Sequence, residues 1–259
     1  MLNEQTATKL NEMRLFGFLQ SYQDRIKRPD HQDLSFSDFF GLLVDDERLY
    51  RQNKKEKRLL KEAKLKIASA CLENIDYQPA RGLIKKKILN LQNTEWLNNH
   101  QNILITGPTG VGKSYLACAF GQWACRNGLS VRYFRWPRLL GDVLAAKGEG
   151  AYLRYLKRLA QIKLLIIDDF GLNPLSDSDR KDFLEIVEDR YMSTSTIIAG
   201  QIPLKDWHEY IGEATIADAI CDRLFHVAHN FEMRGGSMRK LVSVLKFVYF
   251  PKREIRQRS

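Results

Sequence analysis

The residues with the clearest chemistry form a glycine-rich loop that ends in a lysine and a serine. They follow the pattern Gly-x-x-x-x-Gly-Lys-Ser, and they are Gly107, Pro108, Thr109, Gly110, Val111, Gly112, Lys113 and Ser114. The backbone N–H groups of such a loop cradle phosphates, the lysine adds a point charge, and the serine hydroxyl can ligate Mg²⁺. The apolar residues 103–106 before the loop predict a strand, and residues 115–120 predict a helix whose positive N-terminus faces the same point. The pattern predicts a site for ATP and Mg²⁺; the alternative is a chance match.

A second candidate group is a pair of carboxylates at the end of an apolar run. Residues 163–167 read as a buried parallel strand, and Asp168 and Asp169 follow it. We expect Asp168 to hold Mg²⁺, directly or through water. Asp169 is placed to orient and deprotonate the attacking water. The alternative is a buried strand that ends in a solvated turn.

The composition limits the kind of protein. A chain of 259 residues with 44% hydrophobic content suits one full-sized domain and a small accessory domain. No apolar run reaches membrane-spanning length, and the N-terminus lacks the apolar core of a signal peptide. We therefore expect a cytoplasmic protein with no membrane partner. The four cysteines have no metal-site or disulfide spacing, so buried reduced thiols are expected.

The net charge of +10 favours an anionic partner beyond the nucleotide, most simply nucleic acid. Between Arg51 and Lys66 there are eight basic residues against two acidic ones. A further basic group lies on one side of a predicted helix at 151–161. An ordinary solvated helix face is the alternative for the first group. The candidates for contact with duplex DNA are Lys54, Lys55, Lys57, Arg58, Arg154, Lys157 and Arg158.

Two domains are expected. Residues 1–68 look wholly helical, and a long helix capped by Ser35 or Ser37 continues into the basic run without a breaker. Residues 69–259 alternate helices with apolar strands, the later strands at 131–134, 164–168 and 196–199. This alternation predicts an α/β fold with a parallel sheet and right-handed crossovers.

With these pieces in place, the chain resembles the IstB-like helper ATPases of bacterial insertion sequences, relatives of the DnaC helicase loaders within the AAA+ class. The phosphate loop and the 164–171 strand contribute to the resemblance. Gln201-Ile202-Pro203 also contributes, and residues 216–224 and 235–240 are far more specific than the phosphate loop. The resemblance covers nearly the whole chain. It implies an AAA+ P-loop NTPase core with a small all-helical N-terminal domain.

The resemblance also implies roles for three residues. Gln201 is implied to be a polar sensor at the end of the fourth strand, which lies between the strand of the phosphate loop and the strand of Asp168. Arg223 is implied to be an arginine finger, which requires an oligomer; a surface pair with Asp222 is the alternative. Arg239 is implied to be a second basic sensor, unless Ser237 simply caps a helix there.

Three features depart from the family pattern. The acidic pair is Asp-Asp where many relatives have Asp-Glu, so the water must sit closer and hydrolysis is expected to be slow. The fourth strand ends Ala199-Gly200 where Thr-Ser is usual. The segment 241–259 is too short for a multi-helix lid, so a reduced or missing lid is expected.

The function implied is that of a DNA-stimulated ATPase whose homo-oligomer (ring, spiral or filament) assembles on duplex DNA, then recruits and activates a cognate transposase. Hydrolysis would reset the complex. A DnaC-like helicase loader acting with single-stranded DNA is the main alternative. A scaffold that holds ATP without hydrolysing it stays open because of the Asp-Asp pair. A P-loop kinase of a small molecule would leave the basic helix without a purpose.

Overall fold

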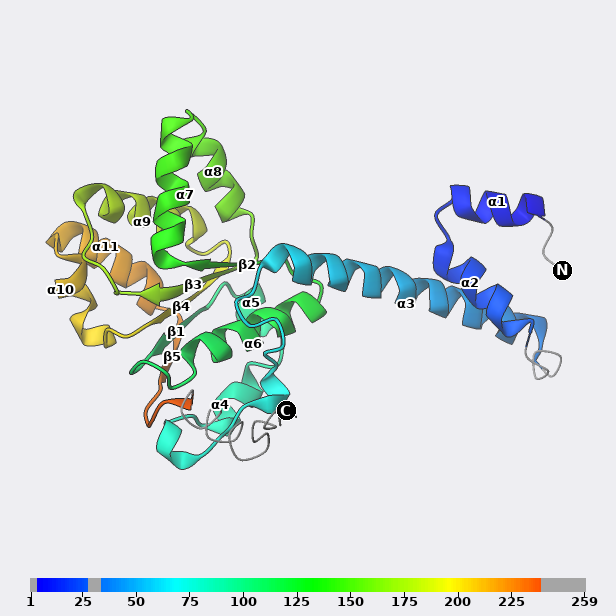
Figure 1. The fold of residues 1–259 in the computed structure, drawn as a ribbon, viewed down its shortest axis with the longest axis horizontal. Coiled ribbons are helices and arrows are strands. Elements are labelled where there is room, and N and C mark those ends of the chain that lie inside the picture. The colour runs from blue at the N-terminus through cyan, green and yellow to red at the C-terminus, as the bar shows by residue number, and fades with distance from the viewer. Residues whose placement is uncertain (1–3, 28–33, 239–259) are drawn as a thin grey trace, which may run out of the picture. The chain divides into compact units, whose positions relative to one another are not determined.

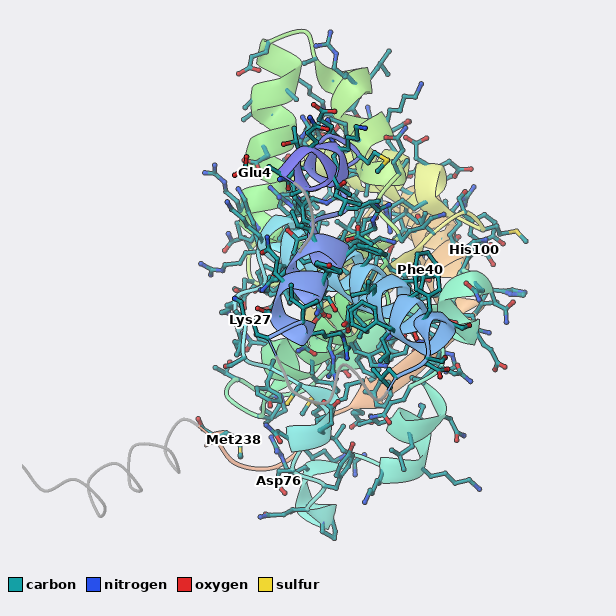
Figure 2. All side chains as sticks on the ribbon, turned by 90° about the vertical axis from the view of Figure 1, so that its right-hand side faces the viewer. Glu4, Lys27, Phe40, Asp76, His100 and Met238 are labelled. Carbon is teal, nitrogen blue, oxygen red and sulfur yellow. The ribbon has the colours of Figure 1, made fainter. Side chains whose placement is uncertain are left out.

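The computed structural model describes residues 4–27 and 34–238, and the side chains of Glu4, Lys27 and Met238 are labelled in Figure 2. The chain divides into two compact units, Met1–Lys61 and Glu62–Ser259. The division falls before the expected boundary at residue 68, so the segment that follows Lys61 belongs to the nucleotide-binding unit. Across the described ranges, no helix is long and apolar enough to cross a membrane.

The N-terminal unit is helical, as predicted. It contains α1 (Glu4–Glu12), α2 (Phe16–Arg25) and most of α3 (Phe36–Ala63), which is 28 residues long. The Ser35 hydroxyl accepts a hydrogen bond from the Asp38 backbone N–H and so caps α3. Helix α3 continues into the basic run, as expected, but Lys64 and Lys66 of that run lie beyond its end. It ends at Ala63, and Lys64 adopts a left-handed backbone with φ of 50°.

The second unit is built on a parallel sheet. Its described strands are β1 (Asn102–Thr106), β2 (Val131–Arg135), β3 (Leu164–Phe170), β4 (Ser195–Gly200) and β5 (Ala228–Glu232), in the order β2-β3-β4-β1-β5. Every pairing is parallel, which confirms the predicted sheet. Strand β4 lies between β1 and β3, as the family resemblance implies. The edge strand β5 was not predicted, because only Phe231 of its residues is fully buried and its sequence is largely polar.

Helices cover both faces of the sheet (Figure 1). Helix α6 (Lys113–Arg126) packs against β1 to β4 on one face. Helices α7 (Trp136–Gly148), α8 (Tyr152–Ala160), α9 (Asp177–Arg190), α10 (Trp207–Ile211) and α11 (Ala214–Phe225) lie on the other. Between α3 and β1 the chain forms the short helices η3 (Pro79–Arg81) and α4 (Lys85–Asn90), separated by Gly82 with φ of 70°. Shorter elements are η2 (Leu72–Asn74), α5 (Glu95–Asn98) and η4 (Leu204–Asp206).

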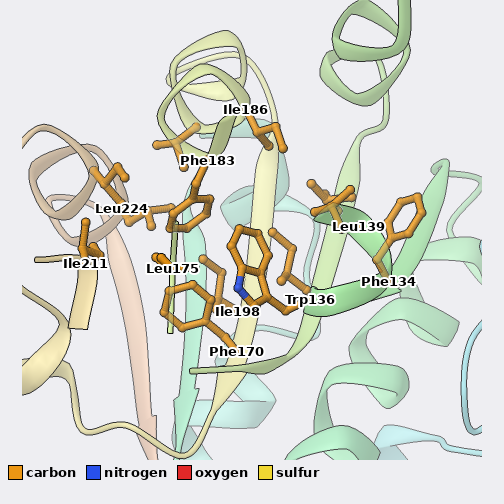
Figure 3. Close-up of a cluster of buried hydrophobic side chains, with 14 of the residues drawn as sticks. Phe134, Trp136, Leu139, Phe170, Leu175, Phe183, Ile186, Ile198, Ile211 and Leu224 are labelled. Carbon is orange, nitrogen blue, oxygen red and sulfur yellow. The ribbon is translucent and has the colours of Figure 1, made fainter. Parts of the chain in front are cut away.

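The larger core lies between the sheet and α7 to α11. Aromatic rings dominate it: Trp136 lies 4.8 Å from Phe183 and 5.4 Å from Phe170, centroid to centroid (Figure 3). Phe170 ends β3 and is fully buried, so this packing fixes the strand that carries the acidic pair. All four cysteines are free thiols; Cys118 and Cys125 are buried, as predicted, whereas Cys71 and Cys221 are only half-buried.

The buried side chain of Arg190 connects several elements of the second unit through hydrogen bonds. The Arg190 guanidinium, 2% exposed at the end of α9, donates to Leu159 O at 2.5 Å, Ile162 O at 3.0 Å and Ser195 O at 2.5 Å. It also donates to Thr196 Oγ1 at 3.0 Å. Burial holds the pKa of this guanidinium below its usual range. The four acceptor oxygens offset the cost of burying the charge, and their hydrogen bonds with Arg190 join α8, α9 and β4.

We expect Arg190→Met to lower the free energy of unfolding by roughly 3–5 kcal/mol, because it leaves four acceptors without their donor. Arg190→Lys should also be costly, since an ammonium cannot reproduce the planar fork. Urea unfolding followed by tryptophan fluorescence measures this, because Trp96, Trp123, Trp136 and Trp207 all lie in the second unit. An exposed control, Lys181→Met, should change little. Equal stability of Arg190→Met and the control would contradict this role.

Candidate nucleotide-binding site

The phosphate loop connects β1 to α6 in a conformation that only glycine adopts easily. Gly107, Gly110 and Gly112 have φ of 144°, 89° and 104°. A Cβ at Gly107 would lie 2.2 Å from Met233 O, and one at Gly110 would lie 2.3 Å from Ser237 Oγ. Segment 233–238 therefore packs directly over the loop, and both close approach and backbone conformation require glycine.

Lys113 is the first residue of α6, so the helix N-terminus opens directly onto the loop. Its Nζ donates to Gly107 O at 2.7 Å and Pro108 O at 2.8 Å. The ammonium is thereby held over the mouth of the loop, where a polyphosphate would meet it.

Asp168 is buried, 1% exposed, and lies beside the loop. Its Oδ2 accepts from Ser114 Oγ at 2.6 Å and from Tyr133 OH at 2.6 Å, and Lys66 Nζ lies 3.4 Å from the same oxygen. Its Oδ1 accepts from the Asp169 N–H at 2.9 Å. Burial, together with the hydrogen bond to this carboxylate, raises the pKa of Tyr133, so the phenol stays a donor.

These oxygens suit a magnesium ion. Mg²⁺ binds proteins through one or two oxygen ligands and completes its shell with waters and substrate phosphates. The Ser114 hydroxyl and the Asp168 carboxylate supply such ligands at the phosphate loop. Among residues 4–27 and 34–238, no group of three or more His, Cys, Asp or Glu side chains could hold a metal alone. Waters and nucleotide phosphates would complete the shell.

Asp169 occupies a bulge at the end of β3. Its φ is 61°, and the β3–β4 register shifts between Ile167 and Phe170. Its Oδ2 accepts from Arg135 Nε at 2.6 Å and lies 3.8 Å from Lys66 Nζ. The bulge also brings Phe170 O so close to Gly200 that a Cβ there would lie 2.6 Å away. Gly200 is therefore a steric consequence of the bulge.

Gln201 meets the loop across the site. Its Oε1 accepts from Thr109 Oγ1 at 2.8 Å. The phosphate loop, the acidic pair and the Gln201 side chain together line a cavity of ≈410 Å³. Its lining residues are Lys66, Ile67, Thr109, Gly110, Gly112, Lys113, Ser114, Tyr115, Asp168, Asp169, Gly200, Gln201 and Met238.

The comparisons with known proteins now bear on this geometry. The model of the family described as IstB-like ATP binding protein matches residues 8–245. The chain belongs to this family. It is 44% identical over 240 residues to a putative insertion sequence ATP-binding protein of Sinorhizobium fredii, covering 93% of this chain and 98% of the relative. It is 26% identical over 230 residues to the insertion sequence IS21 putative ATP-binding protein of Pseudomonas aeruginosa, covering 89% and 86%.

Solved structures of other proteins share the fold of this IstB-like chain. The crystal structure of the DnaC helicase loader matches with a TM-score of 0.52 at 18% identity, over 64% of this chain and 97% of that one. AMPPCP-bound DnaA from Aquifex aeolicus matches with a TM-score of 0.56 at 17% identity, over 72% and 57%. At these identities the likeness shows the fold alone: an α/β P-loop NTPase.

Several residues of this IstB-like site escaped sequence analysis. Arg81 donates to Val111 O at 2.6 Å, and its Nη1 lies 3.5 Å from Asp76 Oδ2. It therefore stabilises the backbone of the phosphate loop. Tyr133 and Arg135 come from β2, whose carboxyl end adjoins that of β3. The one available signal was that neighbouring parallel strands end at the same edge of a sheet.

Arg223 lies at the opposite edge of the sheet. It lines a cavity of ≈190 Å³ with Asn102 and Thr196, near the amino ends of β1 and β4, whereas the phosphate loop follows the carboxyl end of β1. Its Nε lies 2.5 Å from Glu188 Oε2, and its Nη1 donates to Ala219 O at 2.9 Å. The ion-pair partner is therefore Glu188, and the expected alternative of an Asp222 pair is wrong. The structure does not bring Arg223 to the nucleotide cavity of its own chain.

The candidate DNA-binding residues are exposed on two helices. Arg154, Lys157 and Arg158 lie on the outer side of α8, opposite the buried Leu156 and Leu159. Lys54, Lys55, Lys57 and Arg58 are exposed on α3, and Lys54 Nζ lies 5.3 Å from the centre of the Phe16 ring. Lys66, which the sequence grouped with this basic run, lies instead in the nucleotide cavity.

Arg239 and segment 241–259 lie outside the described residues, so the predicted sensor and the reduced lid stay predictions. Met238, the last described residue, lines the nucleotide cavity, and its N–H donates to Gly110 O at 3.0 Å.

Proposed function

We propose that this protein is an ATP-dependent helper of transposition. ATP drives its copies to assemble on duplex DNA, the assembly recruits and activates the cognate transposase, and hydrolysis resets it. The observation that carries the proposal is the meeting of the phosphate loop, Asp168, Asp169 and Gln201 around one cavity in an IstB-like chain. The insertion sequence association of its relatives supports the transposase as partner.

In this proposal each residue of the cavity has one task. The loop N–H groups and Lys113 bind the phosphates. Ser114 and Asp168 hold Mg²⁺, which neutralises charge on the phosphate oxygens when it is bound. Asp169 orients the attacking water and takes its proton, and Gln201 reaches the same region from β4. Arg135 and Lys66 hold the Asp169 carboxylate until substrate arrives.

The position of Arg223 supports the proposed assembly. A guanidinium at the far edge of the sheet cannot reach the nucleotide of its own chain, but a neighbouring copy can present it to the γ-phosphate. Glu188 orients it meanwhile. Arginine fingers supplied by a partner raise phosphoryl-transfer rates by about 10³–10⁵. Bound ATP would therefore hold neighbouring copies together, and its hydrolysis would set when they separate.

The basic faces of α3 and α8 are proposed to follow the DNA backbone. Phosphate contacts carry little sequence information, so binding should be nearly independent of sequence. Many copies along one duplex could bend or untwist it, at a cost set by DNA stiffness.

Neutralising Lys54, Lys55, Lys57 and Arg58 to glutamine should flatten the salt dependence of DNA binding. Each lost phosphate contact lowers the slope of log K against log salt by about 0.9. Fluorescence anisotropy with a labelled duplex at several salt concentrations measures this slope. Two exposed lysines away from both basic faces, Lys163 and Lys181, give the control variant. An unchanged slope in the fourfold variant would make this run an ordinary solvated face.

Electron micrographs of the full chain with ATP and long duplex DNA test the function as a whole. Regular ring, spiral or filament complexes that need ATP are expected, and isolated single copies on the DNA would refute the proposal. Preference for single strands over duplex in the same preparation would favour the helicase-loader alternative. DNA-stimulated phosphate release would exclude a scaffold that only holds ATP.

A further inference from the structure

The nucleotide cavity contains a second lysine, which the phosphate-loop pattern does not include. Lys66 lies 3.4 Å from Asp168 Oδ2 and 3.8 Å from Asp169 Oδ2, measured from its Nζ. It lines the cavity together with Lys113 and Ser114. Its side chain is 36% exposed, so it can move without disturbing the core.

Lys66 contacts Asp168 Oδ2, the carboxylate oxygen that is placed to ligate Mg²⁺. Asp168 Oδ2 accepts from Ser114 Oγ at 2.6 Å, and this pair of oxygens is the one suited to Mg²⁺. The Lys66 ammonium thus lies beside the same oxygen that a divalent cation would use. Two cations that share one ligand repel each other, so a metal ion on this oxygen weakens the contact of the ammonium with it.

The backbone around Lys66 is fixed at both ends. Ala63 and Ala70 are fully buried, and Arg132 donates to Glu62 O at 2.8 Å. Leu65 packs against α6, where its Cδ2 would lie 2.9 Å from a Cβ on Gly121. The contact of Lys66 with the acidic pair therefore attaches the short segment 64–70 to the site, and loss of this contact removes that attachment.

We propose that Lys66 is a resident counter-cation of the acidic pair, which gives way to Mg²⁺ and turns to the nucleotide phosphates. This inference rests on the proposed function and adds a positioning role to it. In the nucleotide-free site, Lys66 neutralises two neighbouring carboxylates together with Arg135. In the loaded site, the same charge lies on the polyphosphate, and segment 64–70 changes its conformation with it.

The variant that tests this is Lys66→Met, which keeps the length of the side chain and removes the charge. Lys64→Met is the matched control, because Lys64 is exposed on the same segment and does not line the cavity. The first readout is Mn²⁺ binding to the full chain without nucleotide, followed by electron paramagnetic resonance. Removing the competing cation should tighten Mn²⁺ binding about tenfold, within the usual range of coupling between two ligands. The control should bind Mn²⁺ like the wild type.

The second readout is hydrogen–deuterium exchange of residues 64–70. In the wild type, ATP with Mg²⁺ should change this exchange, and ATP with EDTA should change it less. In Lys66→Met the difference between the two conditions should disappear. Unchanged Mn²⁺ affinity in Lys66→Met, or equal exchange in the wild type under both conditions, would overturn the proposal.

A parallel measurement separates this inference from the proposed function. Binding of a fluorescent ATP analogue in EDTA depends on the phosphate loop and Lys113, and it tests nucleotide binding itself. Normal analogue binding with an unchanged Mn²⁺ affinity in Lys66→Met would refute the role of Lys66 and leave the proposed function standing. Loss of analogue binding in the wild type would remove both.

Discussion

Lys113→Ala should abolish ATP-dependent assembly on DNA. Lys113 begins α6, and its Nζ lies at the mouth of the phosphate loop. A hydrogen bond to a charged group contributes about 1.5–3 kcal/mol, so losing contacts to two phosphates should weaken ATP binding roughly 100-fold or more. Analytical ultracentrifugation with ATP and duplex DNA measures the assembly, and a fluorescent ATP analogue measures the affinity.

The control for this change is Lys181→Ala, on the exposed side of α9. It should assemble like the wild type. Basic residues on α3 and α8 are untouched in Lys113→Ala, so weak DNA binding by single copies should persist. If Lys113→Ala still assembles in proportion to ATP, the nucleotide does not control assembly through this loop.

Asp169→Asn should leave ATP binding intact and stop turnover. An amide keeps the shape of the side chain but cannot take a proton, and general-base catalysis contributes about 10²–10⁴ in rate. The protein should then stay locked on DNA, since hydrolysis is the proposed reset. Phosphate release measures turnover. The lifetime of the DNA complex after ATP removal measures how long the protein stays bound.

Asp169→Glu is the informative companion, because it restores the carboxylate with one more methylene group. Its turnover should stay within about tenfold of the wild type if the carboxylate acts as the base. Asp177→Asn, an exposed acid at the start of α9, should have no effect. Normal turnover in Asp169→Asn would move the base to another residue.

Local patterns predicted much of this molecule because they depend on neighbours in the chain. The loop was identified from its spacing and the 164–168 strand from its apolar run, and the cap of α3 at Ser35 was one of the two caps expected there. The long helix α3 followed from an uninterrupted run of helix-forming residues. Such signals need no knowledge of which elements meet in space.

The residues that sequence analysis missed act over long separations. Arg81 contacts Val111, and Lys66 contacts Asp168, across stretches of chain whose packing no local pattern encodes. For Arg223, a pair with its neighbour Asp222 was the alternative to the finger role, whereas the fold brings Glu188 of α9 to it. Strand β5 was missed because an edge strand with one buried side lacks the apolar run that marks β3.

The glycine at position 200 has a physical cause that sequence alone could not give. Asp169 is left-handed at the β3 bulge, and Phe170 O lies against Gly200. A serine there would clash unless the bulge relaxed. Gly200 and the bulge at Asp169 therefore belong to one local arrangement.

The central claim is that a nucleotide held by one copy is completed by Arg223 of its neighbour. It is tested most directly by phosphate release from an equimolar mixture of Asp169→Asn and Arg223→Ala chains with duplex DNA and ATP. Each variant alone should be nearly inactive. If neighbours complete each other's sites, random mixing should restore about a quarter of the wild-type rate, since one interface in four combines an intact Asp169 with an intact Arg223. A mixture no more active than the sum of its two components would contradict the claim.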